Sequence, residues 1–187
     1  MTSVPTLPGT GVVLRAHRAD DVRRIVEACS DAETSYWLGT LPVPYDEIDA
    51  RTWLDLQADQ VNLGDTAYWV IADPDTDLFV GSISLMDLFS GSGPEVGYLA
   101  HPDARGRGVM TEAVGLVVRH AFTPRAEGGL GFGKLRLESA LGNTASRRVA
   151  DKAGFREVGV LRSTIICRDG MHDAMRYVLL VTDRPTT

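Results

Sequence analysis

The sequence predicts a mixed α+β domain built on a central, mostly antiparallel, twisted sheet that is flanked by helices. Strand-like and amphipathic helical runs alternate along its 187 residues, and polar turns join the strand-like runs of the first half. With 44% hydrophobic and 24% charged residues, the composition is that of a chain that buries a core. We expect one domain over residues 1–187, with flexible ends at about 1–10 and 184–187.

The first half of the chain is expected to carry two helices and a run of antiparallel strands. Apolar residues three and four positions apart indicate the helices, and turns at 73–77 and 91–94 join the later strands. In order, we expect a strand at 12–15, a helix starting at Asp20, an irregular stretch at 35–44, a helix at about 46–63, and strands at 66–72, 78–85 and 95–100. In the second helix, the residues expected to be buried are Ile48, Trp53, Leu54 and Leu56.

The second half is expected to form a strand–helix–strand–helix–strand unit. After a break at 101–103, apolar residues such as Met110, Ala113 and Val117 share one face of a predicted helix. The segments that follow are a strand at 134–139, a helix at 143–153, and strands at 155–160 and about 173–181. Gly154 is suited to end the helix at 143–153, because glycine readily adopts the left-handed conformation.

Charge and composition argue against several classes of function. A net charge of −6 is unlike a generic nucleic-acid or membrane-surface protein, because both need a basic surface. No apolar run is long enough to span a bilayer, and the first residues lack the features of a secretory signal. Cys29 and Cys167 form no disulfide framework or metal motif, and the four histidines lack metal-ligand spacing. We therefore expect a cytoplasmic protein without a metal site.

The segment Arg105–Ala113, with the sequence RGRGVMTEA, is the sharpest local feature of the chain. Its glycines let the backbone approach a ligand closely, and the first N–H groups of a helix have no partner within the helix. The positive end of the helix dipole and two arginines add local positive charge. The segment predicts an anion site, and a plain helix start with solvated arginines is the alternative.

Together with NTAS…KAGF, which starts at Asn143, this segment resembles the GNAT superfamily of acetyl-CoA-dependent N-acetyltransferases. Arg105 and Gly108 match the first and fourth positions of its R/Q-x-x-G-x-G/A pyrophosphate loop, whereas Met110 stands where Gly or Ala is usual. Further matches, among them EVGY at Glu95, are similar to the branch that contains the RimJ and RimL protein N-terminal acetyltransferases. The resemblance implies the GNAT fold, in which two neighbouring strands are splayed apart.

The resemblance implies that acetyl-CoA lies as co-substrate between the strands at 95–100 and 134–139. The implied cofactor-binding residues are Leu99, His101, Arg105, Gly106, Arg107, Gly108, Val109, Met110, Thr111, Asn143 and Ser146. The backbone amides of 107–111 would hold the pyrophosphate, and Asn143 would bind the pantetheine arm. Arg105, Arg107 and either Arg147 or Arg148 would screen the phosphates. No metal is implied.

Direct attack of an amine on the thioester needs a base, a donor to the oxyanion and help for the leaving thiolate. Glu95 is the candidate base, acting through water, unless it is only a solvated carboxylate at a strand edge. The backbone N–H of Leu99 is the expected oxyanion donor. Much of the superfamily has a tyrosine at the position of Ala150, so Ser146 is the candidate acid, as in the RimL-like branch, unless it only packs the helix.

The acceptor is expected to approach from the face opposite acetyl-CoA, which the segment 35–44 covers in this fold. Tyr36, Trp37 and Leu38 are expected in its wall, with Trp37 as a core plug beneath the loop as the alternative. The acceptor would be a protein N-terminus or a small-molecule amine, and the protein a monomer or homodimer. A second class of function is a GNAT-fold module that binds acyl-CoA without transferring the acyl group, which Met110 and the missing tyrosine would fit.

Overall fold

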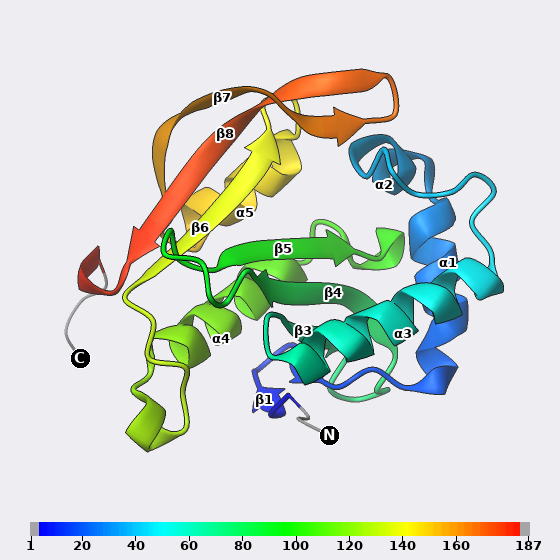
Figure 1. Cartoon of the computed structure of the whole chain (residues 1–187). Helices are drawn as coiled ribbons and strands as arrows, with labels where there is room; N and C mark the ends of the chain where they lie inside the picture. Colours follow the sequence, from blue (N-terminus) through cyan, green and yellow to red (C-terminus); the bar gives the residue numbers. More distant parts are fainter. Residues whose placement is uncertain (1–3, 184–187) are drawn as a thin grey trace.

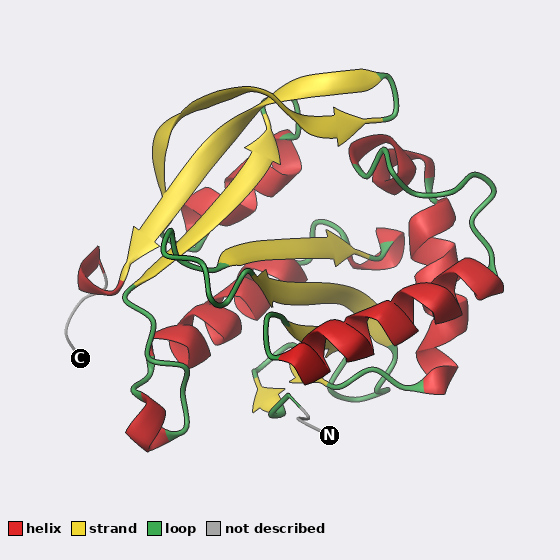
Figure 2. Cartoon of the chain, viewed as in Figure 1, coloured by secondary structure: helices red, strands yellow, loops and turns green. Residues whose placement is uncertain are grey.

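The computed structural model describes residues 4–183, which form a mixed α+β fold around one eight-stranded sheet (Figures 1 and 2). The spatial order of the strands is β1-β2-β3-β4-β5-β6-β8-β7. The strands are β1 (Leu7–Pro8), β2 (Val13–Arg15), β3 (Ala67–Ala72), β4 (Phe79–Met86), β5 (Glu95–Ala100), β6 (Lys134–Ala140), β7 (Arg156–Cys167) and β8 (Gly170–Leu180). The helices are α1 (Val22–Ser30), α2 (Ala32–Trp37), α3 (Glu47–Leu63), α4 (Val109–Phe122) and α5 (Thr144–Lys152). The predicted fold class is confirmed.

Helices cover both faces of the sheet, and the central strand β3 is apolar throughout. In β3, Trp69 and Ile71 pack with α4 in one apolar cluster, and Tyr68 and Val70 pack with α1 and α3 in a second cluster. All six residues of β3 are buried. Burial of alternate side chains on opposite faces therefore explains why this strand shows no polar alternation in the sequence.

The sheet splits between β5 and β6. These two strands run parallel and pair only at Glu95 and Arg136, whereas β6 pairs with β8 along its full length from Lys134 to Ala140. Beyond Glu95, the two strands diverge (Figure 1). The backbone edge of β5 that faces β6 is therefore left without a strand partner from Val96 onward, and the expected splayed pair is confirmed.

The hairpin of β7 and β8 spans the open end of this split and contacts α2. The backbone N–H of Arg168, at the hairpin tip, donates to the carbonyl of Tyr36 at 2.9 Å. The N–H of Gly39 donates to the carbonyl of Ile166 at 3.2 Å. A Cβ atom on Gly39 would lie 2.4 Å from the carbonyl carbon of Cys167, so only glycine allows this approach.

Several local expectations were wrong. The N-terminal ten residues are not simply frayed, because Leu7 and Pro8 form β1 on β2. The expected ends at 1–3 and 184–187 lie outside the described residues. The segment 32–37 is helical, since Asp31 accepts a hydrogen bond from the N–H of Thr34 and caps it. In α3, Ile48 and Leu56 are 74% and 56% exposed, because the face of Ala50 and Leu54 packs inward instead.

Of the helices within residues 4–183, none has the length and apolar character that crossing a membrane would require.

Candidate active site

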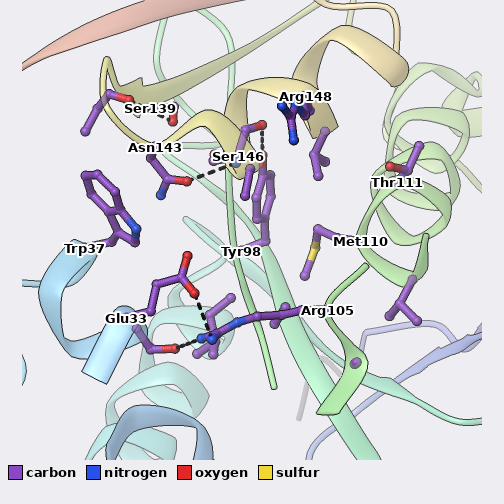
Figure 3. A pocket seen from close by; sticks show the side chains of 18 of the residues that line it. Glu33, Trp37, Tyr98, Arg105, Met110, Thr111, Ser139, Asn143, Ser146 and Arg148 are labelled. Atoms are coloured by element: carbon purple, nitrogen blue, oxygen red, sulfur yellow. Dashed lines mark hydrogen bonds and ion pairs between the residues drawn. The ribbon is translucent and has the colours of Figure 1, made fainter. Parts of the chain in front are cut away.

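The split between β5 and β6 holds a cavity of about 490 Å³. It is lined by side chains from α2, β5, the loop before α4, β6, α5 and the hairpin (Figure 3). Among the sequence-predicted site residues, those in its lining are Trp37, Leu38, Leu99, Arg105, Gly106, Gly108, Val109, Met110, Thr111, Asn143 and Ser146. Arg148 also lines it, and five predicted residues are outside the lining: Tyr36, Glu95, His101, Arg107 and Arg147.

The glycine loop forms the end of the cavity next to α4. Gly106 and Gly108 have φ angles of 74° and 80°, and Gly108 is the N-cap of α4. A Cβ atom at either position would meet nothing within 4 Å, so the space above the loop is open. The N–H groups of the first helical turn point toward this space, as in anion sites at helix N-termini. Met110 is buried beneath the loop and belongs to the main apolar cluster.

The two arginines of the loop differ in their partners. Arg105 forms ion pairs with Asp31 and with Glu33 (3.0 Å), and it donates to the hydroxyl of Thr34 at 2.8 Å. Burial disfavours the charged form of Asp31, but hydrogen bonds from Arg105 and from the backbone of Thr34 outweigh this and lower its pKa. Arg107 is exposed. Arg105 therefore ties the loop to α2, and Arg107 faces solvent.

Asn143, Ser146 and Tyr98 form a connected polar group between the two halves of the sheet. The side-chain oxygen of Asn143 accepts from the N–H of Ser146 at 3.0 Å, which caps α5. The hydroxyl of Tyr98 lies 3.0 Å from the hydroxyl of Ser146 and donates to the Ser146 carbonyl, also at 3.0 Å. The side-chain oxygen of Asn143 thus holds the helix, and its NH2 group is left to act as a donor.

Glu95 lies at the junction of β5 and β6 rather than at the cavity. It is half-buried and lies 3.4 Å from the guanidinium of Arg136. Burial, and then the carboxylate of Glu138, raise the pKa of Glu95. Glu138 follows Arg136 by two residues in β6 and lines the cavity. Its carboxylate forms an ion pair with Arg176 at 2.5 Å. The carboxylate of Glu138 is therefore close enough to raise the pKa of Glu95.

Of the two aromatic residues of α2, Trp37 forms part of the cavity wall and Tyr36 packs behind it. Trp37 lines the cavity, and a Cβ atom on Gly142, in the turn before α5, would lie 3.2 Å from its ring. Tyr36 packs edge-on against Trp37, with ring centroids 4.8 Å apart, and donates to Asp169 of the hairpin tip at 3.0 Å. Trp37 belongs to neither apolar core cluster among the described residues.

His101 is turned away from the cavity. Its Nδ1 atom accepts hydrogen bonds from Arg24 at 3.1 Å and from the backbone N–H of Asp103 at 3.2 Å. Only 3% of the residue is exposed, and burial followed by the charge of Arg24 lowers its pKa. Its side chain fixes the chain between β5 and the glycine loop. Within the described part of the chain, no cluster of His, Cys, Asp or Glu could hold a metal ion.

Sequence reasoning missed Tyr98 and Glu138 as site residues. Alternation along a β-strand assigns each of them to one face of its strand, but it does not place either of them at a cavity. In the strand at 134–139, Leu135 and Leu137 mark the buried face and leave Glu138 on the other. Tyr98 follows Val96 on the face that packs toward α4. The splay between the strands brings these opposite faces to the same cavity, which periodicity alone does not predict.

Comparisons with known proteins agree with this architecture. Residues 12–156, well over half of the chain, match the family described as "Acetyltransferase (GNAT) domain". A curated relative, the probable N-acetyltransferase YjcK of Bacillus subtilis, is 33% identical over 91 residues, which are 48% of each protein. The chain thus spans about half the length of the curated relatives it matches.

Two solved structures share the fold at low sequence identity. Mycobacterium smegmatis RimJ, in complex with CoA-disulfide, has a TM-score of 0.82 and 20% identity, with 99% of this chain and 90% of that chain covered. Spermidine N-acetyltransferase from Vibrio cholerae, in complex with CoA and spermine, has a TM-score of 0.75 and 20% identity, with 94% and 98% covered. The predicted resemblance is confirmed: the chain belongs to the acetyltransferase (GNAT) domain family.

Proposed function

We propose that this protein transfers an acetyl group from acetyl-CoA to a primary amine by direct attack in a ternary complex. The observation that carries the proposal is the continuous cavity that leads from the glycine loop at α4, through the split between β5 and β6, to Ser146. Family membership and the similarity to structures that contain CoA support the same activity.

The residues present fit the parts of acetyl-CoA. The open space above Gly106 and Gly108 would take the pyrophosphate, held by backbone amides of residues 107–111. Arg148 and Lys152 of α5 line the same cavity and would add positive charge, together with the exposed Arg107. The free edge of β5 near Leu99 would pair with the amides of the pantetheine, as an added strand does, and the NH2 group of Asn143 would donate to it.

The chain's own residues supply the polar assistance that the reaction needs. The amine must lose a proton, and we assign this to Glu95 acting through water, with Glu138 lining the route. The N–H of Leu99, at the splayed edge, would donate to the carbonyl oxygen as negative charge develops there. Ser146 would donate to the sulfur as the thiolate leaves. The raised pKa of Glu95 strengthens it as a base.

The acceptor side favours a cationic amine with an apolar neighbour. Trp37 and Leu38 supply an apolar wall, Glu138 lines the same cavity, and Glu95 lies at the junction of β5 and β6. An ammonium group is attracted to carboxylates, and its carbon chain packs on an aromatic ring. A protein N-terminus and a polyamine both present this chemistry, so both belong in the first acceptor panel.

The test is release of free thiol from acetyl-CoA in the presence of an amine panel that contains N-terminal peptides and polyamines. Acceptor-dependent release supports transfer, and Ser146→Ala is expected to slow turnover while leaving CoA affinity, measured by calorimetry, largely intact. Tight CoA binding without release for any acceptor would instead support an acyl-CoA-binding module. No CoA binding would overturn both proposals.

A further inference from the structure

We infer that Tyr98 is a positioning residue that holds the hydroxyl of Ser146 as a hydrogen-bond donor to the sulfur of CoA. This inference rests on the proposed function, because it assigns a partner to the Ser146 hydroxyl in that reaction. It adds a residue of β5 to the stabilisation of the leaving thiolate, which the proposed function assigns to Ser146 of α5 alone.

The first argument is the placement of the two hydroxyl groups. Tyr98 reaches from β5 across the split to the start of α5, where its hydroxyl lies 3.0 Å from the Ser146 hydroxyl (Figure 3). Both residues line the cavity, and both are half-buried. Ala150, one turn further along α5, is fully buried and carries no polar group. A hydroxyl pair at this position therefore comes from Tyr98 and Ser146.

The two hydroxyl groups carry one proton each, which limits the hydrogen bonds they can donate. The Tyr98 hydroxyl has one proton, and it donates this proton to the Ser146 carbonyl, which can only accept. In that arrangement, Ser146 donates its own proton to the Tyr98 oxygen, so neither hydroxyl has a proton left to donate to a ligand. If the Tyr98 proton turns from the carbonyl to the Ser146 oxygen, the Ser146 proton becomes free for a third atom. Both acceptors of Tyr98 lie within hydrogen-bond distance, so a small rotation is sufficient.

We expect this rotation to occur as the thiolate forms. Glu95, acting through water, first takes the ammonium proton and passes it to solvent. The nitrogen–carbon bond of the neutral amine then forms, the carbon–sulfur bond breaks with its electron pair on sulfur, and the second proton that the nitrogen loses goes through water to Glu95. Tyr98 and Ser146 keep their own protons and donate in series, from tyrosine to serine to thiolate. The thiolate leaves as a hydrogen-bonded anion. Burial raises the pKa of Tyr98 to about 12, so the tyrosine keeps its proton throughout.

The experiment measures the pKa of the CoA thiol in its complex with the protein, from the ultraviolet absorbance of the thiolate. It needs no acceptor amine. Four proteins are compared: wild type, Tyr98→Phe, Ser146→Ala and the double variant. The matched control is Tyr177→Phe, because the Tyr177 hydroxyl bonds to Arg147 of the same helix but is outside the cavity lining.

We expect Tyr98→Phe to raise the pKa of the bound thiol by about one unit, a tenfold change in the thiol–thiolate equilibrium. Ser146→Ala is expected to raise it at least as much, and the double variant to match Ser146→Ala, because Tyr98 acts through Ser146. Tyr177→Phe is expected to leave it unchanged. Turnover of Tyr98→Phe should fall in kcat with little change in the KM for the amine.

The outcomes separate the inference from the proposed function. A wild-type thiol pKa in Tyr98→Phe, with CoA affinity retained, would overturn the inference and leave the acetyl-transfer proposal intact. A wild-type thiol pKa in Ser146→Ala would overturn it as well, because Tyr98 would have nothing to act through. Absence of CoA binding to the wild-type protein would overturn the proposed function and the inference together. Phenylalanine preserves the packing of the Tyr98 ring, so the variant is expected to fold.

Discussion

Gly106 and Gly108 are required for their backbone conformation and not because neighbouring atoms crowd them. Both have positive φ angles, which side chains other than glycine adopt only at a cost of about 1–2 kcal/mol. Nothing lies within 4 Å of a Cβ atom built on either residue. The empty space above them is therefore available to a ligand, and a methyl group placed there would meet the ligand rather than the protein.

Gly108→Ala is expected to weaken CoA binding by at least tenfold, because the methyl group blocks the approach of the pyrophosphate to the backbone. Calorimetry with CoA measures the loss. Gly128→Ala is the matched control, since Gly128 has a φ of 85°, an equally open Cβ position and no place in the cavity lining. Equal CoA affinity in Gly108→Ala and Gly128→Ala would contradict the assignment of the loop.

As the proposed base, Glu95 is expected to give the reaction a pH dependence that follows from the direction of its pKa shift. Burial and the charge of Glu138 raise its pKa, so the carboxylate takes up a proton at higher pH than an ordinary glutamate. A base is active only when deprotonated. The acid limb of kcat/KM is therefore expected above the ordinary glutamate value of about 4.3, with activity lost as pH falls through the raised pKa.

Glu95→Gln should lower kcat/KM by about 10²–10⁴-fold near neutral pH, with a smaller loss at high pH, where the amine is already neutral. Glu138→Gln removes a charge that raises the Glu95 pKa and should move the acid limb to lower pH. Rate measurements across pH distinguish the two variants. A Glu95→Gln profile that matches wild type would remove Glu95 from the mechanism.

At the scale of elements, α2 shows where prediction from sequence ended. The sequence predicted β2 to β6, β8, the first part of β7, and the helices α1, α3, α4 and α5, but it missed β1. The segment AETSYW is too short for a periodic pattern, and its helix depends on the Asp31 cap and on Arg105, which lies far along the chain. Likewise, Ile48 and Leu56 were assigned to the wrong face, since apolar residues lie on both faces of α3.

In the candidate site too, residues placed by local sequence were predictable, and residues placed by long-range strand pairing were not. The glycine loop and Asn143 were predictable because local sequence determines a helix start. The placement of Glu95 outside the cavity, and of Tyr98 and Glu138 at it, depends on where the two strands diverge. That position is set by the pairing of β6 with β8, which involves residues far apart in sequence. No local pattern carries this information.

Trp37→Ala is expected to raise the KM for the amine by about tenfold, with little change in CoA affinity or in Tm. The reason is that Trp37 lines the cavity and lies outside both core clusters of the described residues. Trp53→Ala is the matched control, because Trp53 packs edge-on against the buried Tyr68, with ring centroids 5.0 Å apart. The control should lower Tm and keep the wild-type KM. The reverse result would make Trp37 a core residue.

At the scale of the whole molecule, the cavity is framed by a closed chain of contacts. The glycine loop holds α2 through Arg105, α2 holds the hairpin tip through Tyr36, and the hairpin continues through β8 and β6 to β5. The frame is closed by a few bonds at α2 and by one residue pair, Glu95 and Arg136. Both sides of the cavity thus depend on the contact between the hairpin and α2.

Gly39→Ala is expected to separate the hairpin tip from α2, because the added methyl group would lie 2.4 Å from a backbone atom of Cys167. In this variant, hydrogen exchange at the backbone amides of positions 39 and 168 should become faster, and the KM for the amine should rise. Gly91→Ala is the control, since a Cβ atom there meets nothing within 4 Å. Unchanged exchange at both amides in the Gly39 variant would show that the backbone absorbs the clash.

Because β5 and β6 pair at a single position, β6, β8 and β7 can rotate as a unit relative to the rest of the sheet. The strands of the hairpin extend about 35 Å from end to end at about 3.3 Å per residue, so a small rotation at Glu95 and Arg136 moves the tip by a large distance. A ligand in the split touches β5 on one side and α5 on the other, and so resists that rotation. If CoA bound there stabilises the contact with α2, thermodynamic reciprocity requires that the contact stabilises CoA binding by the same factor. Bound CoA should therefore slow hydrogen exchange at the Arg168 amide, at the tip of the hairpin.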